Sequence, residues 1–305
     1  MQKFNKLLVA LDNSDIDEDL INAAAFASEI GKSKSVHFIH IIRDINIPDK
    51  VRKEFPNLLD DALNERRSSI EQKIDQYFDN ENVKTSIEIT SGIATKAILR
   101  FSVKNDIDLI LMGRKNEAKG GGIVVQRVAR RAACSLLIVP RNFDREIKKI
   151  LIPVDFSAPS LDAFNDTISL VKDIEEIKII AQNVYQVPSG YHSTGKSYSE
   201  FARIMAENVK SDFENFAKKI DSQGMDISPI YTLDRHDDVI STVYKTAKTQ
   251  KTDLVVISAK GRTRSTALFL GSRAEKMIQL DTEIPLFVIR PKGKLEGILD
   301  YLKKL

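Results

Sequence analysis

The chain has 305 residues, 42% hydrophobic and 29% charged, which is a globular composition long enough for two domains. Its 46 basic and 43 acidic residues leave a net charge of only +3, which argues against nucleic acid or an anionic membrane as a partner, and no apolar stretch approaches the about 18 residues of a membrane span. Cys134 is the single cysteine, which excludes an internal disulfide and favours a reducing compartment, so we expect a cytoplasmic protein.

The first half of the chain alternates apolar runs of strand length with segments whose apolar residues recur at helical spacing. The expected strands lie within residues 6–14, 34–42, 85–89, 106–113 and 135–141. The expected helices lie at residues 15–31, 60–78, 96–105 and 122–133. The first helix has acidic residues in its first turn and is followed by a glycine, as helix ends prefer.

The second half repeats the first. KILIPVDFS at 149–157 matches KLLVALDNS at 6–14 with a spacing of 143 residues, and KTDLVVIS at 251–258 matches DIDLILMG at 106–113 with a spacing of 145. Further strands are expected at 177–185, 227–231 and 285–291, and further helices at 199–220, 239–250 and 271–281. Matches in the same order with slowly drifting spacing indicate a duplicated domain.

The strands are apolar nearly throughout, as in parallel sheets that helices cover on both faces. The alternation therefore predicts an α/β protein made of two tandem doubly wound, five-stranded parallel-sheet domains of the Rossmann-like type. We expect domains at residues 1–143 and 144–293 and a C-terminal tail at 294–305.

Residues 190–197, GYHSTGKS, fit the phosphate-loop pattern G-x-x-x-x-G-K-[ST], in which backbone amides and a lysine hold phosphates and a hydroxyl holds Mg²⁺. The motif predicts a P-loop NTPase that depends on Lys196. Its context argues against this, because a P-loop follows the first strand of its fold directly, whereas this motif follows the second strand after residues 187–189. The strand at 254–258 also ends in serine where a Walker B aspartate is needed. A polar loop that folds over a bound nucleotide is the alternative interpretation.

A second candidate site lies at the carboxyl ends of the second-half strands, where open parallel sheets bind their ligands. Asp155 ends the first of these strands, and Gly271 and Ser272 open the last helix, whose free amides and positive end attract anions. Candidates nearby are a glycine that permits a tight turn and three cationic residues, namely Gly261, Arg262, Arg264 and Arg273. This set predicts a site for a negatively charged nucleotide.

The segments LIPVDFSAPS, NVYQVP and SAKGRTRSTALFLGSRAEK resemble the universal stress protein family, and the whole chain resembles a tandem pair of such domains. Residues 258–272 fit the family's motif G-2x-G-9x-G-[ST], except that Ser258 replaces the first glycine. The resemblance implies an adenine-nucleotide alpha-hydrolase-like fold and a bound adenine nucleotide. The residues that it places around the ligand are Asp155 at the adenosine end, Val184 beside the base, and Gly261, Gly271 and Ser272 at the phosphates. Ser258 departs from the motif, but serine is small and could still hydrogen-bond a ribose.

The first half carries a degenerate copy of this motif. The counterparts of the second-half residues are Asp12, Ile41, Gly113 and Gly122. Asn116 replaces the second glycine, the loop before Gly122 is shorter, and Ile123 stands where the hydroxyl should be. Three consecutive glycines at 120–122 could form an anion-binding nest or simply let a shortened loop turn. We therefore expect this half to have a structural or regulatory role.

Three functions follow as hypotheses. The first is a stress-response regulatory protein whose second domain binds ATP or a related adenine nucleotide, with or without Mg²⁺. The second is an interaction scaffold that binds an unknown protein partner and no nucleotide, and the third is the P-loop NTPase. No residue pattern for acid–base or nucleophilic catalysis is readable, so we expect no enzyme, with slow ATP hydrolysis or autophosphorylation left open. The four histidines share no metal-ligand spacing.

The last strand of each half offers a pairing edge. The family resemblance implies dimerisation through such strands, and in a tandem chain the strands within 135–141 and 285–291 could pair inside one molecule. Covering an edge strand in this way protects it from unwanted association. We therefore expect an intramolecular pseudo-dimer, with a homodimer as a further alternative.

Overall fold

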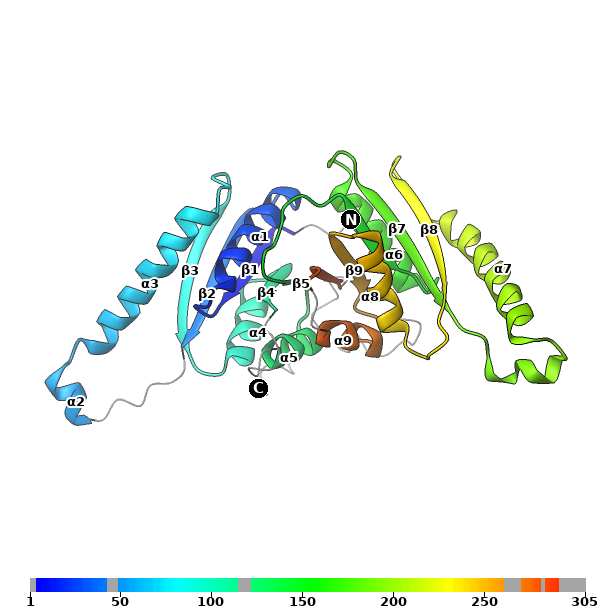
Figure 1. Ribbon diagram of the computed structural model, residues 1–305. Helices are drawn as coiled ribbons and strands as arrows, with labels where there is room; N and C mark the ends of the chain where they lie inside the picture. The colour runs from blue at the N-terminus through cyan, green and yellow to red at the C-terminus, as the bar shows by residue number, and fades with distance from the viewer. Residues whose placement is uncertain (1–3, 43–48, 115–121, 261–269, 281–282, 291–305) are drawn as a thin grey trace. The chain divides into compact units, whose positions relative to one another are not determined.

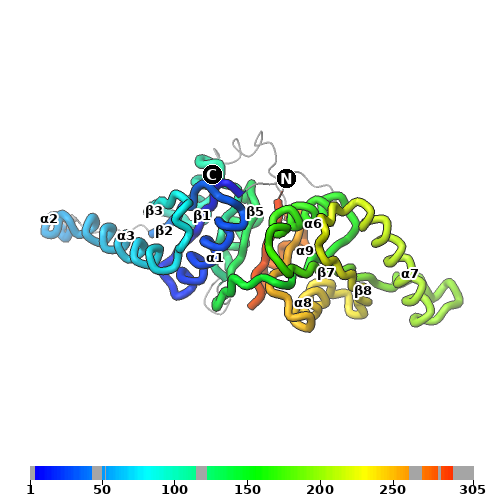
Figure 2. The backbone as a smooth tube through the Cα atoms, turned by 90° about the horizontal axis from the view of Figure 1, so that it is seen from above, coloured from blue at the N-terminus to red at the C-terminus, as the bar shows by residue number. Residues whose placement is uncertain are grey.

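The computed structural model describes residues 4–42, 49–114, 122–260, 270–280 and 283–290. The chain forms two compact units, one ending at Arg145 and the other beginning at Glu146 (Figures 1 and 2). Each unit alternates strands and helices around a five-stranded parallel sheet. This confirms the tandem doubly wound fold predicted from the sequence.

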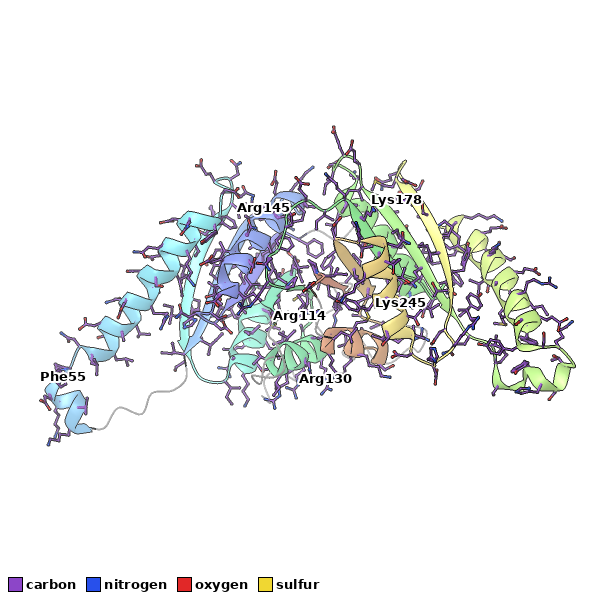
Figure 3. The ribbon with its side chains drawn as sticks, viewed as in Figure 1. Phe55, Arg114, Arg130, Arg145, Lys178 and Lys245 are labelled. Atoms are coloured by element: carbon purple, nitrogen blue, oxygen red, sulfur yellow. The ribbon has the colours of Figure 1, made fainter. Side chains whose placement is uncertain are left out.

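The first unit is built on a sheet whose chain order reverses at its first strand. Its strands are β1 (Lys6–Leu11), β2 (Ser35–Ile42), β3 (Lys84–Ser91), β4 (Leu109–Gly113) and β5 (Ser135–Val139). They hydrogen-bond in parallel in the order β3-β2-β1-β4-β5. Helix α1 (Ile16–Ile30) packs on α3 (Leu58–Tyr77), and α4 (Ala94–Lys104) packs on α5 (Ile123–Arg131). The short helix α2 (Asp49–Glu54) was not predicted, and Phe55 after it is 53% exposed (Figure 3).

The second unit has the same topology. Its strands are β6 (Lys149–Pro153), β7 (Lys178–Tyr185), β8 (Asp226–Leu233), β9 (Leu254–Ser258) and β10 (Leu286–Ile289). They are parallel and lie in the order β10-β9-β6-β7-β8. The helices are α6 (Ala158–Val171), α7 (Tyr198–Ala217), α8 (Val239–Gln250) and α9 (Ser272–Gln279). The carboxyl ends of β6 and β9 are neighbours in this order, so the sheet has its switch point there.

The duplication extends to single hydrogen bonds. Asp253 accepts from the backbone amides of Lys148 and Lys149 at 2.9 and 2.7 Å, and Asp108 accepts from the amide of Lys6 at 3.0 Å. In each unit, therefore, an aspartate just before the fourth strand holds the start of the first strand. Such a bond removes an otherwise unpaired amide where the strand begins.

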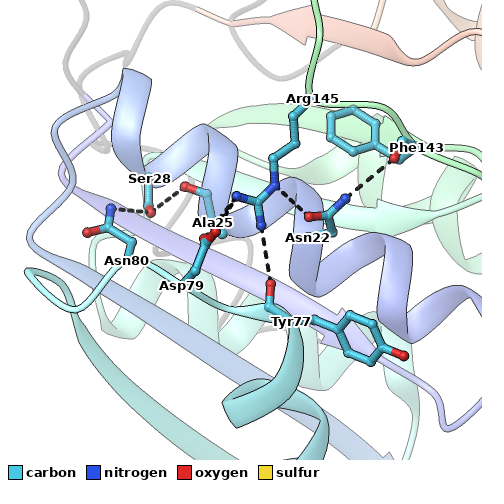
Figure 4. Close-up of polar contacts among 8 residues, drawn as sticks. All are labelled: Asn22, Ala25, Ser28, Tyr77, Asp79, Asn80, Phe143 and Arg145. Carbon is cyan, nitrogen blue, oxygen red and sulfur yellow. Dashed lines mark hydrogen bonds and ion pairs between the residues drawn. The ribbon is translucent and has the colours of Figure 1, made fainter.

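Arg145 holds the last residues of the first unit in place through hydrogen bonds and an ion pair (Figure 4). Its guanidinium donates to Asn22 Oδ1 at 2.5 Å, to the two carboxylate oxygens of Asp79 at 2.9 and 2.8 Å, and to the Tyr77 carbonyl at 3.3 Å. Asn22 donates in turn to the Phe143 carbonyl at 3.4 Å. The segment after β5 is thus held against α1 and the end of α3.

Arg145→Ala should raise the pKa of the Asp79 carboxyl, because the Arg145 guanidinium beside it holds that pKa below its ordinary value. The carboxylate is largely exposed, so the expected loss of unfolding free energy is about 1 kcal/mol or less. A lowered folded-state pKa stabilises the protein above the pKa of the unfolded carboxyl, about 4, and that stabilisation disappears as the pH falls through the folded-state value. NMR titration of Asp79 and urea unfolding at pH 7 and pH 3 test this.

The loss in Arg145→Ala should be smaller at pH 3 than at pH 7. Arg141→Ala is the control, since Arg141 and Asp15 form an ion pair at 3.5 Å with side chains 65% and 86% exposed, and its effect should be near zero at both pH values. An equal loss at both pH values in Arg145→Ala would contradict the prediction.

Candidate nucleotide site

A cavity of about 590 Å³ lies at the carboxyl ends of β6, β7 and β9 in the second unit. Its walls also include residues of α6, α7, α8 and α9, and it therefore occupies the switch point where doubly wound sheets bind ligands. The volume lies within the range of small-molecule sites. Six of the residues predicted from the sequence line it, namely Asp155, Val184, Ser258, Gly271, Ser272 and Arg273. Gly261, Arg262 and Arg264 lie outside the described residues.

The loop after β6 holds Asp155 in a defined position. Asp155 Oδ1 accepts from the Ser157 amide at 3.1 Å and from the Ser157 hydroxyl at 2.6 Å. Phe156 has a φ of 63°, a conformation that is costly for a bulky side chain. Its ring packs on Phe216 with centroids 5.5 Å apart, and this contact helps to hold the turn. Asp155 is half-buried and lines the cavity.

The start of α9 supplies backbone donors to the same cavity. Helices α6, α7 and α8 each have an N-cap side chain that accepts from a first-turn amide, provided by Ser157, Ser197 and Asp238. Helix α9 has Gly271 at this position, and glycine has no side chain to do so. The Gly271 amide donates to the Ala259 carbonyl at 2.8 Å, which joins the start of α9 to the end of β9. A helix start without a side-chain cap can accept an anion at its free amides, and Arg273 and Lys260 also line the cavity.

Ser258 ends β9 and is half-buried in the cavity wall. Its hydroxyl oxygen accepts from the Lys260 amide at 3.3 Å, so the side chain stabilises the turn that follows the strand. The replacement of glycine by serine therefore has a local structural use, and a hydroxyl is added to the wall.

At the corresponding edge of the first unit, a buried carboxylate binds the turn that follows β1. Asp17, which is fully buried, accepts from the amides of Asp12 and Asn13 at 3.1 and 2.9 Å. Burial raises the pKa of the Asp17 carboxyl, and the two backbone donors and Lys73 act in the opposite direction. The position of Asp17 corresponds, 143 residues later, to Ser160 in the second unit. A carboxylate inside the first unit thus binds the turn whose counterpart in the second unit borders the cavity.

The glycines of the first-unit motif also have structural roles. A Cβ atom at Gly113 would lie 2.8 Å from Ile16 Cγ2, so glycine here makes room for α1. Gly122 has a φ of 100°, which favours glycine, and precedes α5. Ile41 is half-buried in β2. These contacts support the shortened-loop interpretation of Gly122, while Gly120 and Gly121 lie outside the described residues.

The phosphate-loop motif adopts a different structure from a P-loop. Residues Ser189–Thr194 form a 3₁₀ helix, and Ser197 is the N-cap of α7 in a capping box with Glu200. Glu200 Oε2 accepts from both the amide and the hydroxyl of Ser197, at 2.8 and 2.7 Å. These hydrogen bonds lower the pKa of the Glu200 carboxyl, which keeps a negative charge where a P-loop would need phosphate and Mg²⁺. None of residues 189–197 lines the cavity.

The two histidines of the first unit lie in β2 and hydrogen-bond to other groups of the sheet. His37 contacts the hydroxyls of Ser35 and Ser86 at 3.1 and 2.7 Å, and His40 Nδ1 donates to the Leu11 carbonyl at 3.1 Å. In the second unit, Asn183 stands at the position that matches His40, and its side-chain amide donates to the Val154 carbonyl at 2.8 Å. Within the described ranges, three or more His, Cys, Asp or Glu side chains do not gather as metal ligands. The same ranges contain no helix with the length and apolar character needed to cross a membrane.

Several cavity residues were not predicted from the sequence, among them Lys260 and the buried polar residues Gln182, Asn183 and Ser160. Gln182 and Ser160 both line the cavity and are almost fully buried. Gln182 and Asn183 are polar residues in an otherwise apolar strand, which was the available signal. For Ser160 the sequence offered no signal other than its difference from Asp17, the residue at the matching position of the first half.

Comparison with known proteins identifies the fold and the family. The model of the universal stress protein family matches residues 3–140 and again 146–290. The universal stress protein MJ0577 of Methanocaldococcus jannaschii is 25% identical over 161 residues, which cover 48% of this chain and 96% of that protein. A universal stress protein from Archaeoglobus fulgidus is similar in structure, with 15% identity and a TM-score of 0.62, covering 94% of this chain and 97% of that one. A functionally unknown protein from Pseudomonas aeruginosa, PA1789, has 16% identity and a TM-score of 0.63, covering 100% and 99% of the two chains. The chain therefore belongs to the universal stress protein family, with one family domain in each half.

Proposed function

We propose that this protein is a stress-response regulator that binds ATP or a related adenine nucleotide in its second unit. The observation that carries the proposal is the start of α9, which has no N-cap side chain and faces a cavity bordered on another side by Asp155. An uncapped helix start beside Arg273 and Lys260 suits phosphates. Asp155 and the half-buried end of β7 suit a nucleoside.

The proposed binding mode assigns one part of the ligand to each wall. The base lies against Val184, the adenosine end approaches Asp155, and Ser258 offers its hydroxyl to the ribose. The phosphates contact the first-turn amides of α9 near Ser272 and Arg273. Any Mg²⁺ would enter with the phosphates, since the described residues offer it no cluster of their own. Binding needs only these donors and the cavity, and the bound state is what a partner protein would recognise.

Calorimetric titration of ATP tests the proposal, with the nucleotide content of the purified protein measured after denaturation. We expect one ATP per chain, because Asp17 occupies the corresponding turn of the first unit. Two sites per chain would contradict the assignment of the first unit as structural or regulatory. Absence of both bound nucleotide and titration heat would refute nucleotide binding and favour the scaffold. Phosphate release in the same samples would report slow hydrolysis.

Lys196→Ala should leave the affinity for ATP unchanged within about twofold, because Lys196 is exposed and does not line the cavity. Lys260→Ala is the matched variant, since it removes the same charge from the cavity wall, and it should weaken binding several-fold, by about 1 kcal/mol. The two titrations are compared at one salt concentration. Loss of binding in Lys196→Ala would restore a role for the 190–197 segment.

A further inference from the structure

Gln182 lines the cavity and has a side-chain amide of fixed orientation. The residue is fully buried in β7 and lines the cavity wall. Its Nε2 donates to the hydroxyl oxygens of Thr232 and Thr246 at 3.0 and 2.7 Å. The Thr246 hydroxyl donates its single proton to the Thr242 carbonyl at 3.1 Å, so its oxygen must accept from Gln182. If the amide were rotated so that Oε1 and Nε2 exchanged places, the hydrogen bond to Thr246 would be lost.

The fixed orientation leaves the amide oxygen without a partner. Among the described residues, no group donates a hydrogen bond to Gln182 Oε1. A buried acceptor of this kind is costly, and native structures usually complete it with a ligand or an ordered water. The corresponding residue of the first unit, 143 positions earlier, is Ile39, which is fully buried and needs no partner. The unpaired acceptor thus belongs to a residue that lines the cavity of the second unit, and its counterpart in the first unit is apolar.

We propose that Gln182 reads the base of the bound nucleotide, with Oε1 accepting a hydrogen bond from the exocyclic amine at position 6 of a purine. This rests on the proposed function. Gln182 and Val184 lie on the same face of β7, because side chains two residues apart in a strand point the same way. The proposed binding mode places the base at Val184 and the phosphates at the start of α9. The base is therefore the part of the ligand assigned to Gln182.

An acceptor at this position discriminates between purines. Adenine presents an N–H donor at position 6, whereas a purine base without the amine leaves Oε1 unpaired. A buried polar group that a competing ligand leaves unpaired is a strong source of specificity. Gln182 would thus select adenine and reject guanine, whose position 6 carries a second acceptor.

The test is a titration of the full chain with ATP and with purine riboside 5′-triphosphate, which lacks only the amine. Wild type should bind ATP at least about tenfold more tightly. Gln182→Met, which keeps the length and volume but has no amide, should reduce the preference to about twofold or less. Gln186→Met is the control, because Gln186 also lines the cavity but its amide donates to Asp234 and Asp237, each at 2.9 Å, and this variant should keep the preference.

Equal binding of the two nucleotides by wild type would overturn the inference and leave the proposed function intact, since an ordered water would then complete Oε1. A preference that persists in Gln182→Met would also overturn it. Failure of wild type to bind either nucleotide would refute the proposed function and this inference together. The comparison of the two nucleotides on wild type decides the matter even if Gln182→Met does not fold.

Discussion

Gly271→Asp should weaken ATP binding by at least about 100-fold while the protein stays folded. The substitution puts a carboxylate at the helix start where the phosphates are proposed to bind, and opposed like charges cost several kcal/mol. Gly271 has φ −63° and ψ 146°, the extended conformation usual for an N-cap. Aspartate is favoured at such positions, so α9 should keep its stability or gain some. Calorimetric titration and thermal unfolding measure the two effects separately.

Gly271→Asn is the matched control, because asparagine also caps helices and has nearly the same size but carries no charge. It should retain far more of the ATP affinity than aspartate does. The difference between the two variants should shrink at high salt, which screens charge. Equal affinities of Gly271→Asp and wild type would show that the phosphates lie elsewhere in the cavity or outside it.

Phe164→Ala should lower the free energy of unfolding of the second unit by about 3–5 kcal/mol. Phe164 is fully buried in α6, and its ring meets that of Phe216 in α7 edge to face, with centroids 6.1 Å apart. Phe216 also contacts Phe156, which directly follows Asp155. The cavity left by the substitution should therefore loosen the Asp155 turn and weaken ATP binding as well. Urea unfolding followed by hydrogen exchange of each unit measures the loss.

Two other phenylalanines serve as controls for this prediction. Phe38→Ala removes an equally buried ring from the first unit and should cause a loss of similar size there, with ATP affinity unchanged. Phe55→Ala removes a ring that is 53% exposed, and the loss should stay below about 0.5 kcal/mol. A small loss in Phe164→Ala would mean that the aromatic contacts between α6 and α7 contribute little to the unit.

The topology and six of the residues that line the cavity could be predicted from the sequence because both depend on local patterns. Apolar runs without polar alternation indicate parallel strands covered on both faces, and the match between residues 6–14 and 149–157 shows the duplication. Parallel topology then brings the carboxyl ends of strands to one edge. Asp155 and Gly271 could be placed at one cavity on these grounds although 116 residues separate them.

The short segments were the least predictable. GYHSTGKS matches a phosphate loop in sequence, yet the residues form a 3₁₀ helix and the N-cap of α7. The same serine suits both structures, and the choice depends on Glu200, whose carboxylate accepts both Ser197 donors. A motif defines which side chains are present, and their neighbours decide whether the donors remain free for a ligand.

The sequence by itself determined the duplication, the order of strands and helices, and the end of the second sheet at which the cavity lies. Only the tertiary structure decided which buried polar groups remain unpaired there. Gln182 finds its partners in Thr232 and Thr246, 50 and 64 residues away, and it is their geometry that leaves Oε1 free. Asp17 and Ser160 occupy matching positions of the two halves. Only the structure shows that the Asp17 carboxylate accepts hydrogen bonds from the amides of the turn after β1. Periodicity is a local property of the chain, whereas hydrogen-bond pairing in a core depends on groups that distant segments bring together.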